Sequence, residues 1–320
     1  MAKQVAVVGG GMMGAGIAAC LASGGPHTVR ICSRTIEEAE ACKEKALGLV
    51  HLLVESGAAA EEVGQIEAVA SLPEAVAGAE FIFEVVFEDL AVKQGVMQEL
   101  EQHAGPNAIF CTNTSSLSVT AIAEGCKKNG AERIIAAHFI GPAHLVPLVE
   151  LCPGALTAGQ GSDDGPIERV RKFLESIGKR PIVMKKEIQG FIAARLQAAL
   201  YRECLHIVQS GSADCEAVDR AVFDGFGRRL NQIGPFQQAD FAGVDLVQGT
   251  HARFFPQLGD YQRDVRADEL VSQGRLGTKT LAGHYDWTDE RVKEVMGRRD
   301  AELLRRLKAD RLPSSRSSPY

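Results

Sequence analysis

The chain has eight cysteines but no Cys-x-x-Cys pair and no regular cysteine spacing. A disulfide framework is therefore not expected. Cys32 and Cys111 fall within apolar runs typical of buried strands. We expect all eight cysteines to be free thiols that serve as small core residues, which suits a reducing cytosol and predicts a cytoplasmic protein.

Other signals are missing as well. No apolar run has the length of a membrane span, and no His, Cys, Asp and Glu cluster has the spacing of metal ligands, so neither a membrane nor a metal is expected. The first apolar run begins near Gln4, which leaves no room for a signal peptide. A net charge of −6 disfavours nucleic acid as a partner.

The composition that remains is globular, and 320 residues are enough for two domains. Near-continuous apolar strands alternate with helices in the first half, which is typical of a parallel sheet covered on both faces. From Phe191 onward the apolar spacing is helical. The expected strands are residues 4–8, 28–32, 81–85, 108–112, 133–138, 145–151 and 180–184. The expected later helices are 217–223, 236–254, 267–273 and one beginning near Thr288.

We predict an α/β fold in which a doubly wound sheet domain, residues 1–186, precedes an all-helical domain, residues 187–320. The Ser-rich tail from about residue 313 is expected to be disordered.

A glycine motif joins the first expected strand to a helix. Gly9 permits a tight turn, Gly11 lets the backbone approach a pyrophosphate, and Gly14 lets the helix pack on the strand. Met12 and Met13 then stand at the helix N-terminus, where unsatisfied N–H groups attract phosphate. The sheet domain is therefore predicted to be a Rossmann-type dinucleotide-binding domain.

The end of the second strand bears on the choice of cofactor. An NAD enzyme usually has an acid there to accept a hydrogen bond from the ribose 2′-hydroxyl, whereas this chain has Ser33 and Arg34. A hydroxyl and a planar guanidinium can hold a 2′-phosphate. We therefore favour NADP. The alternative is NAD, with Arg34 as a solvated loop residue.

Two side chains predict acid–base chemistry. His138 ends one apolar strand, and Glu150 lies inside the next. If these strands fold back on each other near residue 144, the two side chains oppose one another, and the carboxylate would orient the imidazole. Such a pair can take a proton from an alcohol as hydride leaves its carbon.

A polar segment, Asn113-Thr114-Ser115-Ser116, follows the strand 108–112 at its carboxyl end, where ligands bind in open α/β sheets. A hydroxyl there can bind a substrate oxygen. Capping of the next helix is the alternative role, and both roles are compatible.

Along nearly its whole length the chain resembles the L-3-hydroxyacyl-CoA dehydrogenase superfamily. The matching segments are 9–14, 84–93, 112–117, His138-Phe139, Val149-Glu150, 190–192, 234–236 and 277–280. Segment 145–150 and the basic C-terminal helix are more similar to the lambda-crystallin and L-gulonate 3-dehydrogenase branch. The region around 277–285 is more similar to the hydroxyacyl-CoA branch.

The resemblance implies a Rossmann domain followed by a helical domain that forms a homodimer. It also implies that His138 is the acid and base, Glu150 its partner and Ser115 the hydroxyl on the substrate oxygen. The implied cofactor-binding positions are Val85, Glu88, Lys93 and Asn113.

The chain departs from the family at its substrate side. Gly141 and Ala194 stand where the family has asparagines, so two amides are missing. These positions, with Arg228 and Arg229, are the candidate substrate residues.

Three hypotheses follow. The first is an NAD(P)-dependent oxidoreductase that interconverts a 3-hydroxyacyl thioester, on CoA or acyl-carrier protein, and its 3-oxo form. The second is a dehydrogenase of a free hydroxy acid, of the sugar-acid or carnitine type, whose carboxylate Arg228 and Arg229 would hold. The third is a non-catalytic NADPH-binding protein, which is less favoured because an unused buried His–Glu pair is costly.

Overall fold

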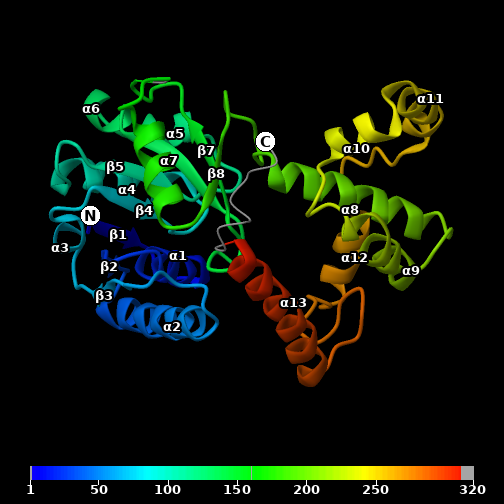
Figure 1. The fold of residues 1–320 in the computed structure, drawn as a ribbon, viewed down its shortest axis with the longest axis horizontal. Coiled ribbons are helices and arrows are strands. Elements are labelled where there is room, and N and C mark those ends of the chain that lie inside the picture. The colour runs from blue at the N-terminus through cyan, green and yellow to red at the C-terminus, as the bar shows by residue number, and fades with distance from the viewer. Residues whose placement is uncertain (1, 160, 311–320) are drawn as a thin grey trace. The chain divides into compact units, whose positions relative to one another are not determined.

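A computed structural model describes residues 2–159 and 161–310 (Figure 1). They divide into two compact units, residues 2–193 with 297–310, and residues 194–296. The first unit contains the sheet, and the second consists of helices and turns. The expected disordered tail lies outside the described residues.

One sheet of eight strands forms the first unit, in the order β3-β2-β1-β4-β5-β6-β7-β8. The strands are β1 (Gln4–Val8), β2 (Thr28–Cys32), β3 (Gln65–Ala68), β4 (Phe81–Glu84), β5 (Ile109–Thr112), β6 (Ile134–Phe139), β7 (Leu148–Pro153) and β8 (Arg180–Val183). Neighbouring strands are parallel except β6 and β7, which are antiparallel. The order reverses between β1 and β4, which is where ligands bind in doubly wound sheets.

Helices cover both faces because alternate strand residues point to opposite sides. Val5 and Val7 pack with α1 (Met12–Ser23), α2 (Ile36–Glu55) and α7 (Pro166–Ser176). Ala6 and Val8 pack with the helices of the opposite face. These are α3 (Leu72–Val76), α4 (Leu90–His103), α5 (Val119–Ala123) and α6 (Lys128–Ala131). Figure 1 shows α1 and α2 together beside β1 and β2.

Two strand predictions need correction. Strand β3 was not expected, because its four residues at the sheet edge include only one buried side chain, Ile66. The strand expected over 145–151 begins later, at Leu148, because Leu145 and Val146 both donate backbone hydrogen bonds to the carbonyl of Pro142 and so form a turn.

The second unit is helical, as expected. It contains α8 (Ala193–Gln209), α9 (Cys215–Arg220), α10 (Pro235–Ala242), α11 (Val244–Phe254), α12 (Val265–Ser272) and the start of α13 (Asp289–Asp310), with short helical turns η1 (Ala221–Gly225), η2 (Phe226–Arg228) and η3 (Phe255–Gln257). The prediction of one helix over 236–254 is wrong. Gly243 adopts a φ of +95°, a backbone conformation that ends α10 before α11 begins.

The eight cysteines are free, and Cys32 and Cys111 are buried, as predicted, but Cys126, Cys204 and Cys215 are only half-buried and so are not core residues. Among the residues that the model describes, no three His, Cys, Asp or Glu side chains are grouped so that they could bind a metal ion. None of the helices within 2–159 and 161–310 has both the length and the hydrophobicity that crossing a membrane requires.

Candidate functional site

The glycine motif forms the turn between β1 and α1. Gly9 has a φ of +124°, and a Cβ on it would lie 2.6 Å from the carbonyl oxygen of Val85. A Cβ on Gly14 would lie 2.1 Å from the carbonyl oxygen of Gly9. Only glycine fits at either position, as the motif predicts.

A cavity of about 790 Å³ opens beside this turn. A Cβ on Gly11 would meet no atom within 4 Å, so the backbone there is open to a ligand. The N-terminus of α1 begins at Met12, where free N–H groups favour a pyrophosphate. The predicted residues that line the cavity are Gly9, Gly11, Met12, Met13, Ser33, Arg34 and Val85. These residues fit a dinucleotide.

At the cavity edge, the two residues expected to bind a 2′-phosphate, Ser33 and Arg34, already bind a carboxylate of the protein. Ser33 Oγ donates a 2.8 Å hydrogen bond to Glu38 Oε2, and Arg34 forms an ion pair with the same carboxylate. Glu38 lies in the first turn of α2. The structure therefore brings a carboxylate to the place where the strand itself supplies none.

The hydrogen-bonded pair expected from the sequence is present. His138 and Glu150 are register partners in the antiparallel strands β6 and β7, so the prediction that these strands fold back is confirmed. His138 Nδ1 lies 2.8 Å from Glu150 Oε2, and both side chains are buried. The ring of Phe191 stacks on the imidazole with centroids 5.2 Å apart.

Glu150 has a second set of partners. Its Oε1 accepts 2.9 Å hydrogen bonds from the backbone N–H groups of Ile192 and Ala193, where α8 begins. Both oxygens of a fully buried carboxylate are thus hydrogen-bonded, which offsets the cost of its burial.

Asn113 follows β5 and lies against β6. Its Oδ1 accepts a 2.8 Å hydrogen bond from the N–H of Phe139, the residue after His138. The amide therefore holds the end of β6 in place beside the imidazole.

Glu88 organises the segment that carries Ser115. Its Oε1 accepts hydrogen bonds of 2.6 Å from Thr114 Oγ1 and 2.8 Å from the N–H groups of Ser115 and Ser116. Partial burial opposes ionisation of Glu88, but these hydrogen bonds and the charge of Lys93 lower its pKa to about 2. The carboxylate is thus firmly ionised and fixes the Ser115 backbone.

Lys93 is buried between two carboxylates. Its Nζ lies 2.7 Å from Glu84 Oε1 and 3.5 Å from Glu88 Oε2, and Thr112 Oγ1 donates a 2.6 Å hydrogen bond to Glu84 Oε2. Sequence reasoning assigned no role to Glu84. A buried acid at the end of an apolar strand was the signal that could have found it.

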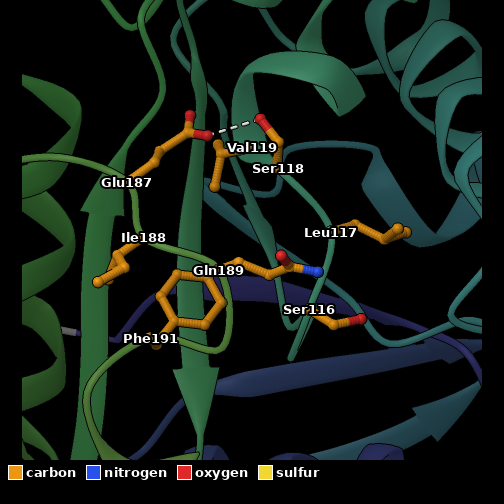
Figure 2. Close-up of a pocket in the computed structure, with 8 residues that line it drawn as sticks. All are labelled: Ser116, Leu117, Ser118, Val119, Glu187, Ile188, Gln189 and Phe191. Carbon is orange, nitrogen blue, oxygen red and sulfur yellow. Dashed lines mark hydrogen bonds between the residues drawn. The ribbon is translucent and has the colours of Figure 1, made fainter. Parts of the chain in front are cut away.

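A smaller cavity of about 370 Å³ lies next to Phe191, between the segments 116–119 and 187–191 (Figure 2). Glu187 closes one end, where it accepts a 2.6 Å hydrogen bond from Ser118 Oγ. Figure 2 shows the Gln189 amide extending toward Ser116 and Leu117. Because Phe191 also stacks on His138, this cavity adjoins the His–Glu pair.

The remaining candidates are the predicted substrate residues. A Cβ on Gly141 would meet only Met13 Sδ, at 3.8 Å, so the space for the missing amide is open. Ala194, Arg228 and Arg229 belong to residues 194–296, the other unit, so their roles at the His–Glu pair stay predictions.

A doubly wound sheet with a dinucleotide cavity at the reversal of its strand order, and a buried His–Glu pair in the same sheet, is the arrangement of a nicotinamide-dependent dehydrogenase acting on CH–OH donors. Two family models cover the chain: 3-hydroxyacyl-CoA dehydrogenase, NAD binding domain, over residues 4–188, and 3-hydroxyacyl-CoA dehydrogenase, C-terminal domain, over residues 190–287. The chain belongs to the 3-hydroxyacyl-CoA dehydrogenase family.

Characterised relatives differ in their named substrates. The chain is 29% identical over 312 residues to 5-formyl-3-hydroxy-2-methylpyridine 4-carboxylate 5-dehydrogenase of Mesorhizobium japonicum, covering 95% of this chain and 97% of the relative. It is 32% identical to L-carnitine dehydrogenase of Oceanobacillus iheyensis at the same coverage. It is also 32% identical to 3-hydroxyadipyl-CoA dehydrogenase of Escherichia coli, covering 92% of this chain and 61% of that protein.

Solved structures agree with this assignment. The crystal structure of the formyl-hydroxy-methylpyridine carboxylate dehydrogenase, described as an NAD+-dependent dismutase, matches with a TM-score of 0.89 at 28% identity, over 98% of this chain and 100% of that one. Escherichia coli 3-hydroxybutyryl-CoA dehydrogenase matches with a TM-score of 0.70 at 30% identity, over 89% of this chain and 59% of that one. The family binds NAD, and the NADP preference inferred from Arg34 finds no support.

Proposed function

We propose that His138 is the general base of an NAD-dependent alcohol dehydrogenase. The observation that carries this proposal is the 2.8 Å hydrogen bond between the buried His138 Nδ1 and Glu150 Oε2. A carboxylate at Nδ1 keeps the proton on that nitrogen and leaves Nε2 basic, so Nε2 can accept the proton of a substrate hydroxyl. When bound, NAD would supply the hydride acceptor for the carbon that carries this hydroxyl.

The neighbouring groups support the proton transfer. Glu150 stabilises the imidazolium that forms when His138 takes up the proton. Ser115, whose backbone N–H donates to Glu88, is the proposed hydrogen-bond donor to the substrate oxygen. In the reverse direction, the same imidazolium returns its proton to the carbonyl oxygen.

The substrate that we propose is a small free hydroxy compound bearing a carboxylate. Two relatives that align over 95% of this chain and 97% of their own length are named for free compounds, carnitine and a pyridine carboxylate. The loss of the amide at Gly141 is a second argument, because the space left there is open to a substrate that differs from the family's thioesters. Arg228 and Arg229 remain the proposed carboxylate partners.

A 3-hydroxyacyl thioester is the second candidate. The family models carry the hydroxyacyl-CoA name, and 3-hydroxyadipyl-CoA dehydrogenase is as similar in sequence as carnitine dehydrogenase. The intact His138–Glu150 pair serves either substrate equally well.

A substrate panel tests both candidates. NAD reduction would be followed with L-carnitine, small 3-hydroxy acids, hydroxymethylpyridine carboxylates and 3-hydroxybutyryl-CoA, for the wild type and for His138→Asn. We expect turnover with a free acid and a loss of roughly 10²- to 10⁴-fold in His138→Asn. The control variant is His51→Asn, since His51 is exposed on α2.

Each outcome has a clear meaning. Turnover of the CoA thioester alone would replace the free-acid proposal by the second candidate. Full activity of His138→Asn would contradict the proposed base for either substrate.

The helical unit supports a further part of the proposal, a homodimer. In residues 194–296 only Leu205, Val218 and Leu270 are buried apolar side chains, whereas Phe236 and Phe241 on α10 are more than four-fifths exposed. Large exposed apolar surfaces mark sites of protein association. A second copy of this unit is the proposed partner.

A further inference from the structure

Glu38 stands at the edge of the dinucleotide cavity without belonging to the glycine motif or to the end of a strand. It lies in the first turn of α2, and its backbone N–H donates a 3.2 Å hydrogen bond to the N-cap residue Thr35. A Cβ on Gly10 would lie 2.9 Å from Ser33 Oγ and 3.1 Å from the Glu38 carbonyl oxygen. The turn from β2 to α2 therefore packs directly on the glycine-rich loop.

The Glu38 carboxylate collects the donors around it. Ser33 Oγ donates to Oε2 at 2.8 Å, Arg34 Nε donates to Oε2 at 3.3 Å, and Arg34 Nη2 pairs with Oε1. The guanidinium also lies over the ring of Phe87, 5.4 Å from its centroid. The hydrogen bonds from Arg34 and Ser33 lower the pKa of Glu38, so it is ionised at neutral pH.

These contacts reverse the expectation that Ser33 and Arg34 bind a 2′-phosphate. A phosphate there would have to displace an ionised carboxylate from both donors and would lie beside its negative charge. A ribose 2′-hydroxyl is a hydrogen-bond donor, and a carboxylate accepts from it without repulsion.

We infer that Glu38 selects NAD over NADP, by accepting a hydrogen bond from the adenosine ribose and by repelling a 2′-phosphate. Ser33 and Arg34 then act as positioning residues that hold the carboxylate. The inference deepens the proposed function, since it rests on NAD as the hydride acceptor.

The charges that line the cavity explain why Glu38 alone can determine the cofactor preference. The charged residues that line it are Arg34, Glu38, Lys45 and Glu99, two of each sign. Neutralising Glu38 alone leaves one positive charge in excess and frees Arg34 for a phosphate. A single substitution should therefore change the cofactor preference.

The test is a fluorescence titration of NADH and of NADPH without substrate, on the wild type, Glu38→Gln and Glu37→Gln. Glu37 is the matched control, because it lies in the same first turn of α2 but does not line the cavity. In Glu38→Gln we expect NADPH to bind at least about tenfold more tightly and NADH several-fold more weakly. The control should keep both dissociation constants within about twofold.

Two further variants separate the roles of charge and donor. Glu38→Asp keeps the charge and should retain the preference for NADH. Glu38→Gln combined with Arg34→Ala should lose the gained affinity for NADPH, because the guanidinium that supplies it is gone.

The inference is overturned if Glu38→Gln leaves the ratio of NADPH to NADH affinity within about twofold of the wild type. It is also overturned if the wild type binds NADPH more tightly than NADH. Failure of the wild type to bind either cofactor would instead contradict the proposed function, so the two failures are distinguishable.

Discussion

At the scale of single residues, Glu150 connects chemistry with structure. One of its oxygens faces His138, and the other accepts hydrogen bonds from Ile192 and Ala193 where α8 begins. Removing the side chain would leave these two N–H groups without their partner, so a change in activity alone would not separate chemistry from stability. A glutamine separates the two effects, because its amide oxygen can still accept from the backbone.

Glu150→Gln should therefore lower kcat strongly and change the stability of the fold little. With the amide oxygen retained by Ile192 and Ala193, the amide NH₂ faces His138 Nδ1 and forces the proton of the imidazole onto Nε2. We expect kcat to fall by roughly 10²- to 10⁴-fold while the NADH dissociation constant stays within about twofold.

The comparison variants are Glu150→Ala and Glu124→Gln. The alanine variant should also lower the melting temperature, whereas Glu124 is exposed at the end of α5 and its substitution should change neither quantity. If Glu150→Gln kept more than about a tenth of the wild-type kcat, the proposed tautomer control would be wrong.

At the scale of elements, charged and polar side chains link the carboxyl ends of β4 and β5. Glu84 ends β4 and binds Lys93 of α4 and Thr112 of β5. Glu88, in the loop after β4, binds the segment after β5. This network positions Ser115 from a neighbouring loop.

Glu88→Gln should destabilise the protein in a pH-dependent way. The pKa of Glu88 falls from an ordinary 4.5 to about 2 on folding, so its ionised form adds stability above pH 4.5 that is lost as the pH falls toward 2. Allowing for its partial exposure, we expect a loss of roughly 1–2 kcal/mol at neutral pH.

Thermal unfolding at about pH 7 and about pH 3 measures this difference. The difference in melting temperature between the wild type and Glu88→Gln should be smaller at the lower pH. Glu61→Gln, at an exposed position, is the matched control. If the difference in melting temperature were the same at both pH values, the ionised carboxylate of Glu88 would not be the cause of the destabilisation.

At the scale of the whole molecule, the helical unit has too small an apolar core of its own. Residues 194–296 bury three apolar side chains, and α10 and α11 expose Phe236, Phe241, Val244 and Leu246. Burial of apolar area is the main favourable term in folding and association, so this unit needs a further surface to cover it.

Phe236→Glu should therefore weaken the proposed dimer. By light scattering, we expect the wild type at about twice 34.3 kDa and the variant shifted toward the monomer at micromolar concentration. Val54→Glu places the same charge on an exposed apolar position of α2 and should leave the mass unchanged. A monomeric wild type would refute the proposed dimer.

Much of the sheet unit could be predicted because its signals are local. The turn at Gly9 follows from backbone sterics, and most strands follow from apolar runs. The opposition of His138 and Glu150 was also predictable, because a short connection between two strands restricts their pairing. The short strand β3 was missed because its residues alternate weakly, and the break at Gly243 because an isolated glycine also occurs within helices.

Residue types at fixed spacing were enough to predict the dinucleotide-binding motif, the alternation of strands and helices, and the His–Glu pair. Tertiary structure decided which partners the charged side chains take. Glu84 binds Lys93 because α4 packs beside β4, and Glu88 binds Thr114 because the loop after β4 lies beside the segment after β5. Such contacts depend on the directions of whole helices and strands. Packing of the hydrophobic core sets these directions, and they cannot be predicted from the spacing of residues along the chain.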